Sequence, residues 1–314
     1  MSDAPLPVLF LLGSGRNGST VLANLLGSAN GVANVGEIHW IWERGVAQNR
    51  LCGCGEPFLE CPFWGAVLSP AEEQAAAAAH EAGRRATLEG LRPLRLVGRH
   101  WTRRASEAQR RYVSRTDRLY RAVASVADAG VLVDSSKRPV YAFALTKAPS
   151  LDVYVVHLVR DPRAVVFSWR RRKVNPDIVG GGLMAVHPAW KTAAGWTVWN
   201  LMAELLGAKR RGRYLRIRYE DFVADPLSTL QTIGDLVGTA VAPDFTSPTD
   251  FEVEPSHSIS GNPSRFDVGT VRLSEDIEWI GGIGRRDRIT TTVLTWPLML
   301  RYRYPLRRRS GSGR

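Results

Sequence analysis

A glycine-rich turn between an expected strand and an expected helix is the first feature of the sequence that could do chemistry. Residues 8–12 are a continuous apolar run, typical of a buried parallel strand, and the apolar residues after Thr20 have helical spacing. Between them lies GSGRNGST, at residues 13–20. Glycines let the backbone approach a ligand closely, and a helix N-terminus offers unpaired N–H groups to an anion. By itself, the pattern fits a phosphate or sulfate site and an ordinary strand-to-helix turn equally well.

The cation of this turn is in an unusual place. The nucleotide triphosphate loop reads G-x-x-x-x-G-K-[ST], and Gly13 and Gly18 fit that spacing, but Ser19 stands at the lysine position. The positive charge is instead Arg16, inside the turn. We therefore expect a phosphorylated ligand other than ATP or GTP.

Three further strand ends carry polar side chains. Residues 131–134, VLVD, lead to Lys137, and residues 151–159 lead to Arg160, with Ser168 in the helix that follows. A second short strand is expected at 32–35, and it ends at Gly36 and Glu37. The carboxyl ends of parallel strands meet at one edge of a sheet, where open α/β folds bind their ligands. We expect these groups to lie together, although the acid that ends VLVD also keeps a P-loop kinase as an alternative.

The elements that must position these groups alternate between strand and helix. This order predicts an α/β fold, a parallel sheet flanked by helices in three layers. With 314 residues we expect one domain over 1–304, a helical insertion at about 40–128 and a basic, disordered tail at 305–314. We also expect a strand at 214–222, a glycine-rich loop at 175–184 that closes over the site, and a long structureless stretch at 239–270.

The net charge of +12 raises the alternative of a nucleic-acid-binding protein. Six of the arginines fall in the last fourteen residues, so much of the excess charge belongs to the tail. No apolar run approaches the roughly 20 residues that span a bilayer, and residues before the first strand lack the basic region of a signal peptide. We expect a cytoplasmic protein without a transmembrane segment.

The three cysteines, Cys52, Cys54 and Cys61, lie within one short segment. Their C-x-C-x6-C spacing matches no common zinc pattern, and His39 is the nearest candidate for a fourth ligand. We therefore expect a packed cysteine-containing loop and no metal.

The strand-end motifs together resemble the sulfotransferase family that uses 3′-phosphoadenosine 5′-phosphosulfate (PAPS), and in particular its bacterial and carbohydrate-type branches. GSGRNGST is similar to the family's 5′-phosphosulfate loop, and VHLVRDPRAVVFSW is similar to its 3′-phosphate motif. RYEDF, GNPSRF and the closing RYRYP also resemble later segments of the family. The resemblance covers most of the chain and implies a P-loop-like fold.

The resemblance also implies a role for each matching residue. The 5′-phosphosulfate would be held by the loop residues Gly15, Arg16, Asn17, Gly18, Ser19 and Thr20. Arg160 and Ser168 would hold the 3′-phosphate, with help from Arg265. Lys137 would lie near the transferred group, and Glu37 would be the general base.

The implied reaction moves a sulfuryl group from PAPS to a hydroxyl of a carbohydrate or another small acceptor. It needs cations at the leaving group and a base at the acceptor, and it requires no metal. Arg16 and Lys137 supply the charge, and His39 is the alternative base. Neither the acceptor nor the oligomeric state follows from the sequence.

Overall fold

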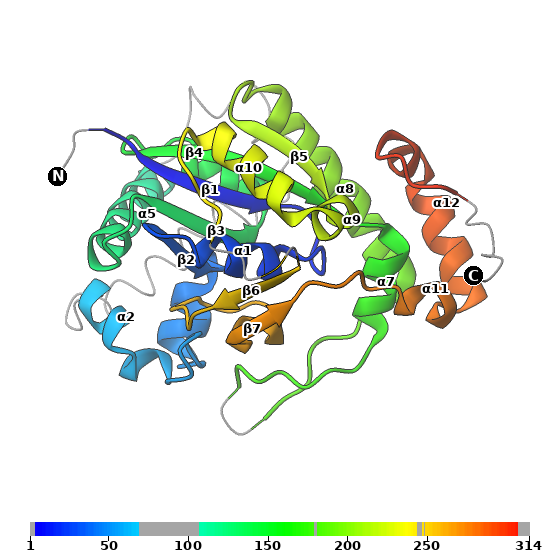
Figure 1. Cartoon of the computed structure of the whole chain (residues 1–314), viewed down its shortest axis with the longest axis horizontal. Helices are drawn as coiled ribbons and strands as arrows, with labels where there is room; N and C mark the ends of the chain where they lie inside the picture. The colour runs from blue at the N-terminus through cyan, green and yellow to red at the C-terminus, as the bar shows by residue number, and fades with distance from the viewer. Residues whose placement is uncertain (1–3, 69–106, 179–180, 244–246, 248, 307–314) are drawn as a thin grey trace.

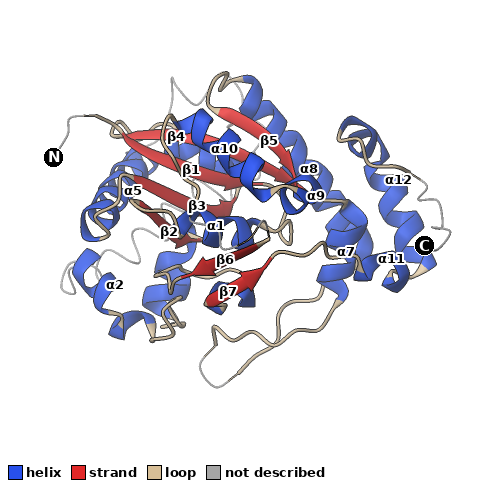
Figure 2. Cartoon of the chain, in the orientation of Figure 1, coloured by secondary structure: helices blue, strands red, loops and turns tan. Residues whose placement is uncertain are grey.

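A five-stranded parallel sheet forms the centre of the molecule (Figures 1 and 2). The computed structural model describes residues 4–68, 107–178, 181–243, 247 and 249–306. The strands of the sheet are β1 (Leu6–Leu12), β2 (Val32–Gly36), β3 (Val131–Lys137), β4 (Leu151–Val159) and β5 (Tyr214–Arg218), in the spatial order β2-β3-β1-β4-β5. All four neighbouring pairs are parallel, which confirms the predicted α/β class.

Helices cover both faces of this sheet, because the strands are buried on both sides. Within β1, Val8 and Phe10 belong to one core cluster, and Leu9 and Leu11 belong to the other. The first cluster is completed by α2 (Pro62–Val67), α5 (Glu107–Val126), α6 (Pro139–Leu145), α8 (Ala189–Ala208) and the short helices η1 (Ile38–Trp40) and η2 (Ile41–Ala47). The second is completed by α1 (Ser19–Gly27), α9 (Tyr219–Ala224) and α10 (Pro226–Val237). The three-layer arrangement is therefore confirmed.

Two helices that follow strands of the sheet open on a proline. Pro139 opens α6, and Pro162 opens α7 (Pro162–Arg170), because proline has no N–H to lose at a first helical position. Asp161 caps α7, since its carboxylate accepts a 2.9 Å hydrogen bond from the backbone N–H of Arg163. The last helices, α11 (Glu278–Gly282) and α12 (Arg285–Arg301), pack beside α7 (Figure 1).

Two expectations about the second half of the chain are wrong. The strand predicted at 214–222 ends at Arg218, because α9 begins at Tyr219 and buries Tyr219 and Phe222 in the core. The stretch 239–270 is not structureless. It contains β6 (Asp250–Val253) and the short helix η5 (Pro263–Phe266), and its last residues enter β7 (Gly269–Arg272), the antiparallel partner of β6.

The predicted helical insertion is described only in part. Its segment 69–106 lies outside the described residues, as does 307–314 of the predicted basic tail. The C-terminal part of the insertion, α5, packs against β3 and α6, so it belongs to the helical layer of the sheet. The single-domain division stays a prediction.

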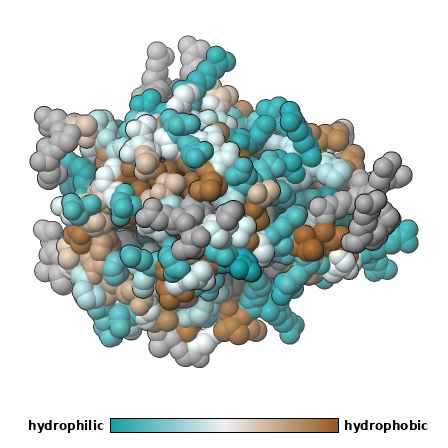
Figure 3. Space-filling view, viewed as in Figure 1, coloured by the Kyte–Doolittle hydropathy of each residue, from teal (hydrophilic) through white to brown (hydrophobic). Residues whose placement is uncertain are grey.

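The described surface is mostly polar on the face shown in Figure 3, with hydrophobic residues in separate patches among hydrophilic ones. In the part of the chain that the structure describes, every helix is too short or too polar to cross a bilayer.

Candidate active site

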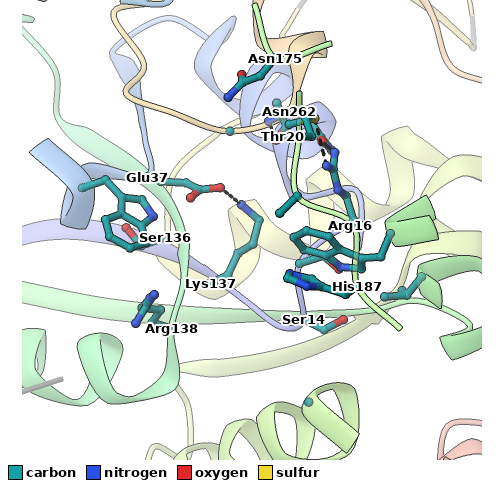
Figure 4. Close-up of a pocket in the computed structure, with 18 of the residues that line it drawn as sticks. Ser14, Arg16, Thr20, Glu37, Ser136, Lys137, Arg138, Asn175, His187 and Asn262 are labelled. Carbon is teal, nitrogen blue, oxygen red and sulfur yellow. Dashed lines mark hydrogen bonds and ion pairs between the residues drawn. The ribbon is translucent and has the colours of Figure 1, made fainter. Parts of the chain in front are cut away.

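The carboxyl ends of β1, β2 and β3 open into one pocket of about 670 Å³ (Figure 4). β1 lies inside the sheet, with β3 on one side and β4 on the other, so the chain order reverses beside it. Crevices at such reversals are where open α/β sheets bind ligands. The pocket is lined by Arg16, Glu37 and Lys137, among the residues that the sequence predicts.

The glycine-rich turn is held rigidly behind the pocket. The Asn17 side chain donates a 2.9 Å hydrogen bond to the Leu158 carbonyl of β4 and accepts one from the N–H of Ser19. Gly18 has a φ of 94°, and a Cβ atom there would meet the ring of Tyr219 at 2.4 Å. Glycine is therefore required at the position that precedes α1.

Arg16 is the charged residue of this turn, and it lines the pocket. Its backbone has a φ of 68°, an uncommon conformation for a residue with a side chain. The guanidinium donates to the side-chain oxygen of Asn262 and lies over the Trp169 ring, 4.9 Å from its centroid. Burial lowers the pKa of Arg16, an effect that Glu37 opposes. The strained backbone and the aromatic contact fix the position of this charge.

Glu37 and Lys137 point toward one another across the pocket (Figure 4). The Lys137 ammonium lies 2.5 Å from a Glu37 carboxylate oxygen and donates a 2.9 Å hydrogen bond to the Ser135 carbonyl. Both strands are irregular where they deliver these residues. β2 and β3 shift register at their ends, Gly36 has a φ of 68° and Lys137 has a φ of 65°. The irregular strand ends turn the carboxylate and the ammonium into the same space.

The cations around Glu37 decide its charge. Burial alone would raise the pKa of Glu37, but Lys137, Arg44 and Arg138 together outweigh burial, so the pKa lies below its usual value. The carboxylate is therefore ionised at neutral pH.

Sequence reasoning missed several residues of the pocket wall. Arg44 lies on η2, a π-helix, and donates to the Ser260 hydroxyl. The guanidinium groups of Arg44 and Arg138 lie over the ring of the pocket residue Trp40, at 4.3 and 4.9 Å from its centroid. A π-helix has no signal in the residue pattern, so Arg44 could not have been found. Arg138 directly follows Lys137, and this adjacency was the available signal.

Described residues of the predicted 175–184 loop, and His187 after it, contribute to the pocket wall. Asn175, Asp177, Leu183, Met184 and His187 line the pocket. The Arg16 guanidinium also contacts the Met184 sulfur at 3.0 Å.

Arg160 lies beside the glycine-rich turn rather than in the large pocket. Its guanidinium donates to the Arg16 carbonyl at 3.2 Å, pairs with Asp276 at 2.7 Å and stacks on Tyr219 at 4.3 Å. It lines a smaller neighbouring pocket of about 70 Å³, together with Asp276 and Tyr219. The structure therefore brings the two predicted phosphate motifs into contact.

Ser168 and Arg265 are not among the lining residues of either pocket. Ser168 is half-buried on α7. The buried Arg265 pairs with Asp177 at 3.0 Å and donates to the carbonyls of Leu51 and Ser258. These contacts join three segments of the chain, and a role toward phosphate for either residue stays a prediction.

Asp134 is the acid on which the kinase alternative depends. In a P-loop nucleotidase the acid at this strand end would bind Mg²⁺. Asp134 is instead fully buried, and it accepts hydrogen bonds from the Tyr120 hydroxyl and the backbone N–H of Ser136. The Asp134 carboxylate therefore makes hydrogen bonds within the core, between β3 and α5.

Replacing Asp134 by Asn is expected to flatten the pH dependence of stability. Burial raises the pKa of Asp134 to about 7, although its hydrogen bonds oppose the shift. An unfolded aspartate titrates near 3.9, so between about pH 4 and pH 7 the folded state holds more protons and the unfolding free energy falls as pH rises. Urea unfolding across this window should show a smaller decline for D134N than for the wild type. The exposed D128N is the control, and parallel curves for D134N and the wild type would contradict the assignment.

Comparisons with known proteins agree with this geometry. The model of the sulfotransferase family matches residues 7–243. Carbohydrate sulfotransferase 2 of Mus musculus is 30% identical over 137 residues, covering 32% of this chain and 26% of that protein, and the Homo sapiens protein of the same name is 29% identical over 137 residues. The match thus spans about a quarter of the length of these relatives.

Two solved structures share the fold. They are the sulfotransferase domain of the Synechococcus PCC 7002 olefin synthase (TM-score 0.54, 20% identity, 97% of each chain) and that of the curacin biosynthetic pathway (TM-score 0.54, 18% identity, 97% of this chain and 100% of that one). The family match covers the glycine-rich turn, Glu37, Lys137 and Arg160, and the fold that positions them is that of sulfotransferase domains. The chain belongs to the sulfotransferase family.

Proposed function

We propose that this protein transfers a sulfuryl group from PAPS to a hydroxyl of a carbohydrate or another small hydroxylated acceptor. The observation that carries the proposal is the convergence of Arg16, Lys137 and Glu37 in one pocket beside the N-terminus of α1. Sulfuryl transfer needs cations where the leaving oxygen gains charge and a base where the acceptor loses its proton. The names of the curated relatives support a carbohydrate acceptor.

The residues around the glycine-rich turn fit the phosphosulfate end of PAPS. Within the described part of the chain, the buried hydroxyls of Ser14 and Ser19 have no hydrogen-bond partner. Ser19 opens α1, so its hydroxyl lies at the positive end of the helix dipole. We assign the turn from Gly15 to Thr20 to this end of the donor, with Asn17 holding the turn in shape. PAPS, when bound, supplies the sulfuryl group.

The chain's own residues then act on charge and on one proton. Glu37, kept ionised by its cationic neighbours, takes the proton of the acceptor hydroxyl. Arg16 and Lys137 stabilise the charge on the leaving oxygen, and one well-placed donor of this kind contributes about 3–4 kcal/mol. The walls with Trp40, Trp169 and Trp199 offer apolar surface to the acceptor.

Replacing Arg160 by Ala is expected to weaken the binding of 3′,5′-adenosine bisphosphate roughly 10-fold to 100-fold. The reason is that a hydrogen bond to a charged group contributes about 1.5–3 kcal/mol. Adenosine 5′-phosphate lacks the 3′-phosphate, so its binding affinity should fall much less in this variant. Isothermal calorimetry with both nucleotides measures the difference. The variant D276N, which removes the charge of the Arg160 partner but keeps the arginine, should retain the preference for the bisphosphate. Equal losses on both nucleotides in R160A would give Arg160 a structural role only.

Calorimetry also separates the three functional classes. PAPS should bind, whereas ATP with Mg²⁺ and duplex DNA should bind weakly or not at all. If ATP with Mg²⁺ bound and PAPS did not, the proposal would be overturned in favour of a kinase.

Incubation with PAPS and fractionated extract, followed by mass spectrometry for a gain of SO₃, would identify the acceptor. The cytoplasmic location and a metal-free transfer reaction stay predictions.

A further inference from the structure

Three cysteines and one histidine meet on the side of the fold near Glu37. Cys52 and Cys54 lie in the turn after η2, and Cys61 precedes α2. His257 belongs to the segment between β6 and η5, about two hundred residues further along the chain. The ligand atoms of the four residues all lie within 4.8 Å of one another. Sequence spacing gave no sign of His257, and His39 is not part of the group.

Four of the six distances between these atoms are close to those of a tetrahedral site, and the other two are at most 4.8 Å. The Cys61 sulfur lies 3.6 Å from that of Cys52 and 3.7 Å from that of Cys54. The Nδ1 atom of His257 lies 3.3 Å from the Cys61 sulfur and 3.8 Å from the Cys52 sulfur. With zinc bonds of about 2.3 Å to sulfur and about 2.0 Å to nitrogen, a tetrahedron has S–S edges of about 3.8 Å and S–N edges of about 3.5 Å. One ion at the centre would therefore reach all four ligands with small adjustments.

The backbone is arranged to hold the ligands together. Gly55, with a φ of 94°, makes the tight turn in which its N–H donates to the Cys52 carbonyl at 2.9 Å. The N–H of Gly53 donates to the Ser258 carbonyl at 3.0 Å. A Cβ atom at Gly53 would meet the Ser256 carbonyl at 2.4 Å, so only glycine lets the turn approach the histidine segment this closely.

The orientation of the His257 ring is also fixed. The ring of Phe63 stacks on it with centroids 4.5 Å apart and an angle of 1° between the planes. The indole N–H of Trp64 donates to the His257 carbonyl at 3.0 Å. Both residues lie on α2, which begins directly after Cys61, so the helix that follows one ligand orients another.

We propose that Cys52, Cys54, Cys61 and His257 bind one zinc ion in a closed structural site. Three thiolates and one imidazole complete a tetrahedral shell, which leaves no position for substrate. Cys52 and Cys61 are each 1% exposed, as suits a structural site. The three thiols release their protons to solvent when the ion binds, and no oxidant takes part.

The site has a consequence for the pocket. Ile259 forms β-bridges to both Cys52 and Gly36, and its carbonyl accepts a 2.6 Å hydrogen bond from the N–H of Glu37. The same segment continues to Asn262, the partner of Arg16. Zinc would therefore fix the chain that supports Glu37 and Arg16, at a site where the ion takes no part in the transfer.

The test is the zinc content of the full chain, purified without chelators and measured by plasma mass spectrometry. We expect about one zinc per chain for the wild type and for H39Q, and a loss of most zinc in C61S and H257F. Because the loss of a ligand can unfold a variant, the wild-type chain is also stripped of metal under reducing conditions and titrated with Co²⁺. The visible bands of tetrahedral cobalt thiolate should appear at one equivalent, and zinc should displace them and raise the melting temperature.

Three results would overturn the proposal. The first is a reduced wild-type chain that carries no zinc and takes up neither ion. The second is a native mass lower by two hydrogen atoms, which would show a disulfide among the cysteines. The third is full zinc content in both C61S and H257F, which would place the ion elsewhere.

Discussion

Replacing Glu37 by Gln is expected to lower the turnover number about 10²-fold to 10⁴-fold, the usual contribution of a positioned general base. Glutamine keeps the size of the side chain and an oxygen that accepts from Lys137, but it cannot take a proton. Binding of 3′,5′-adenosine bisphosphate should stay near the wild-type value, because Glu37 acts on the acceptor. Steady-state kinetics with the acceptor identified by sulfation of extracts, together with calorimetry, measure the two effects.

His39 provides the decisive comparison, because it is the alternative base and lines the same pocket. Its ring is buried between aromatic neighbours, with the Trp40 and Tyr141 centroids 4.5 and 5.8 Å away. H39Q should therefore affect turnover less than E37Q, and the exposed E60Q should leave it unchanged. If H39Q abolished turnover while E37Q retained it, the proton would go to His39.

The parts of the fold that could be predicted are those fixed by local patterns. The apolar run 151–159 is β4 itself, and the proline and aspartate signals mark the starts of α6 and α7. The β5 boundary could not be predicted, because the switch to α9 at Tyr219 depends on packing against α10 and the sheet. The hairpin of β6 and β7 could not be predicted for a similar reason, because the polar turn around η5 separates the two strands in the sequence.

The site, like the fold, has parts that the sequence predicts and parts that depend on tertiary packing. Arg16, Glu37 and Lys137 could be predicted to meet, because each lies at the end of a parallel strand and topology alone brings such ends together. Topology does not give a side chain's partners. The pairing of Arg265 with Asp177, the stacking of Arg138 on Trp40 and the approach of His257 to the cysteines all join segments far apart in the sequence. Those contacts depend on tertiary packing, which a residue pattern does not encode.

Replacing Lys137 by Met is expected to lower the turnover number about 10²-fold to 10³-fold, because it removes a donor that stabilises the leaving oxygen. Methionine preserves most of the side-chain volume, so affinity for the bisphosphate product should change little. K137R keeps the positive charge at the same backbone position and should recover part of the activity. Unchanged turnover in K137M would exclude Lys137 from the reaction.

K137M should also move the acidic limb of the pH–rate profile, which tests the coupling between Lys137 and Glu37. Burial favours the neutral form of Glu37, and Lys137 is the first of the cations that reverse this effect. Without the ammonium, the pKa of Glu37 rises, so the carboxylate becomes ionised only at higher pH and activity falls off sooner on acidification. K137R should keep the limb near its wild-type position. A limb that stays in place in K137M would mean that the group titrating there is not Glu37, because a carboxylate so close to Lys137 cannot lose that charge without a shift in its pKa.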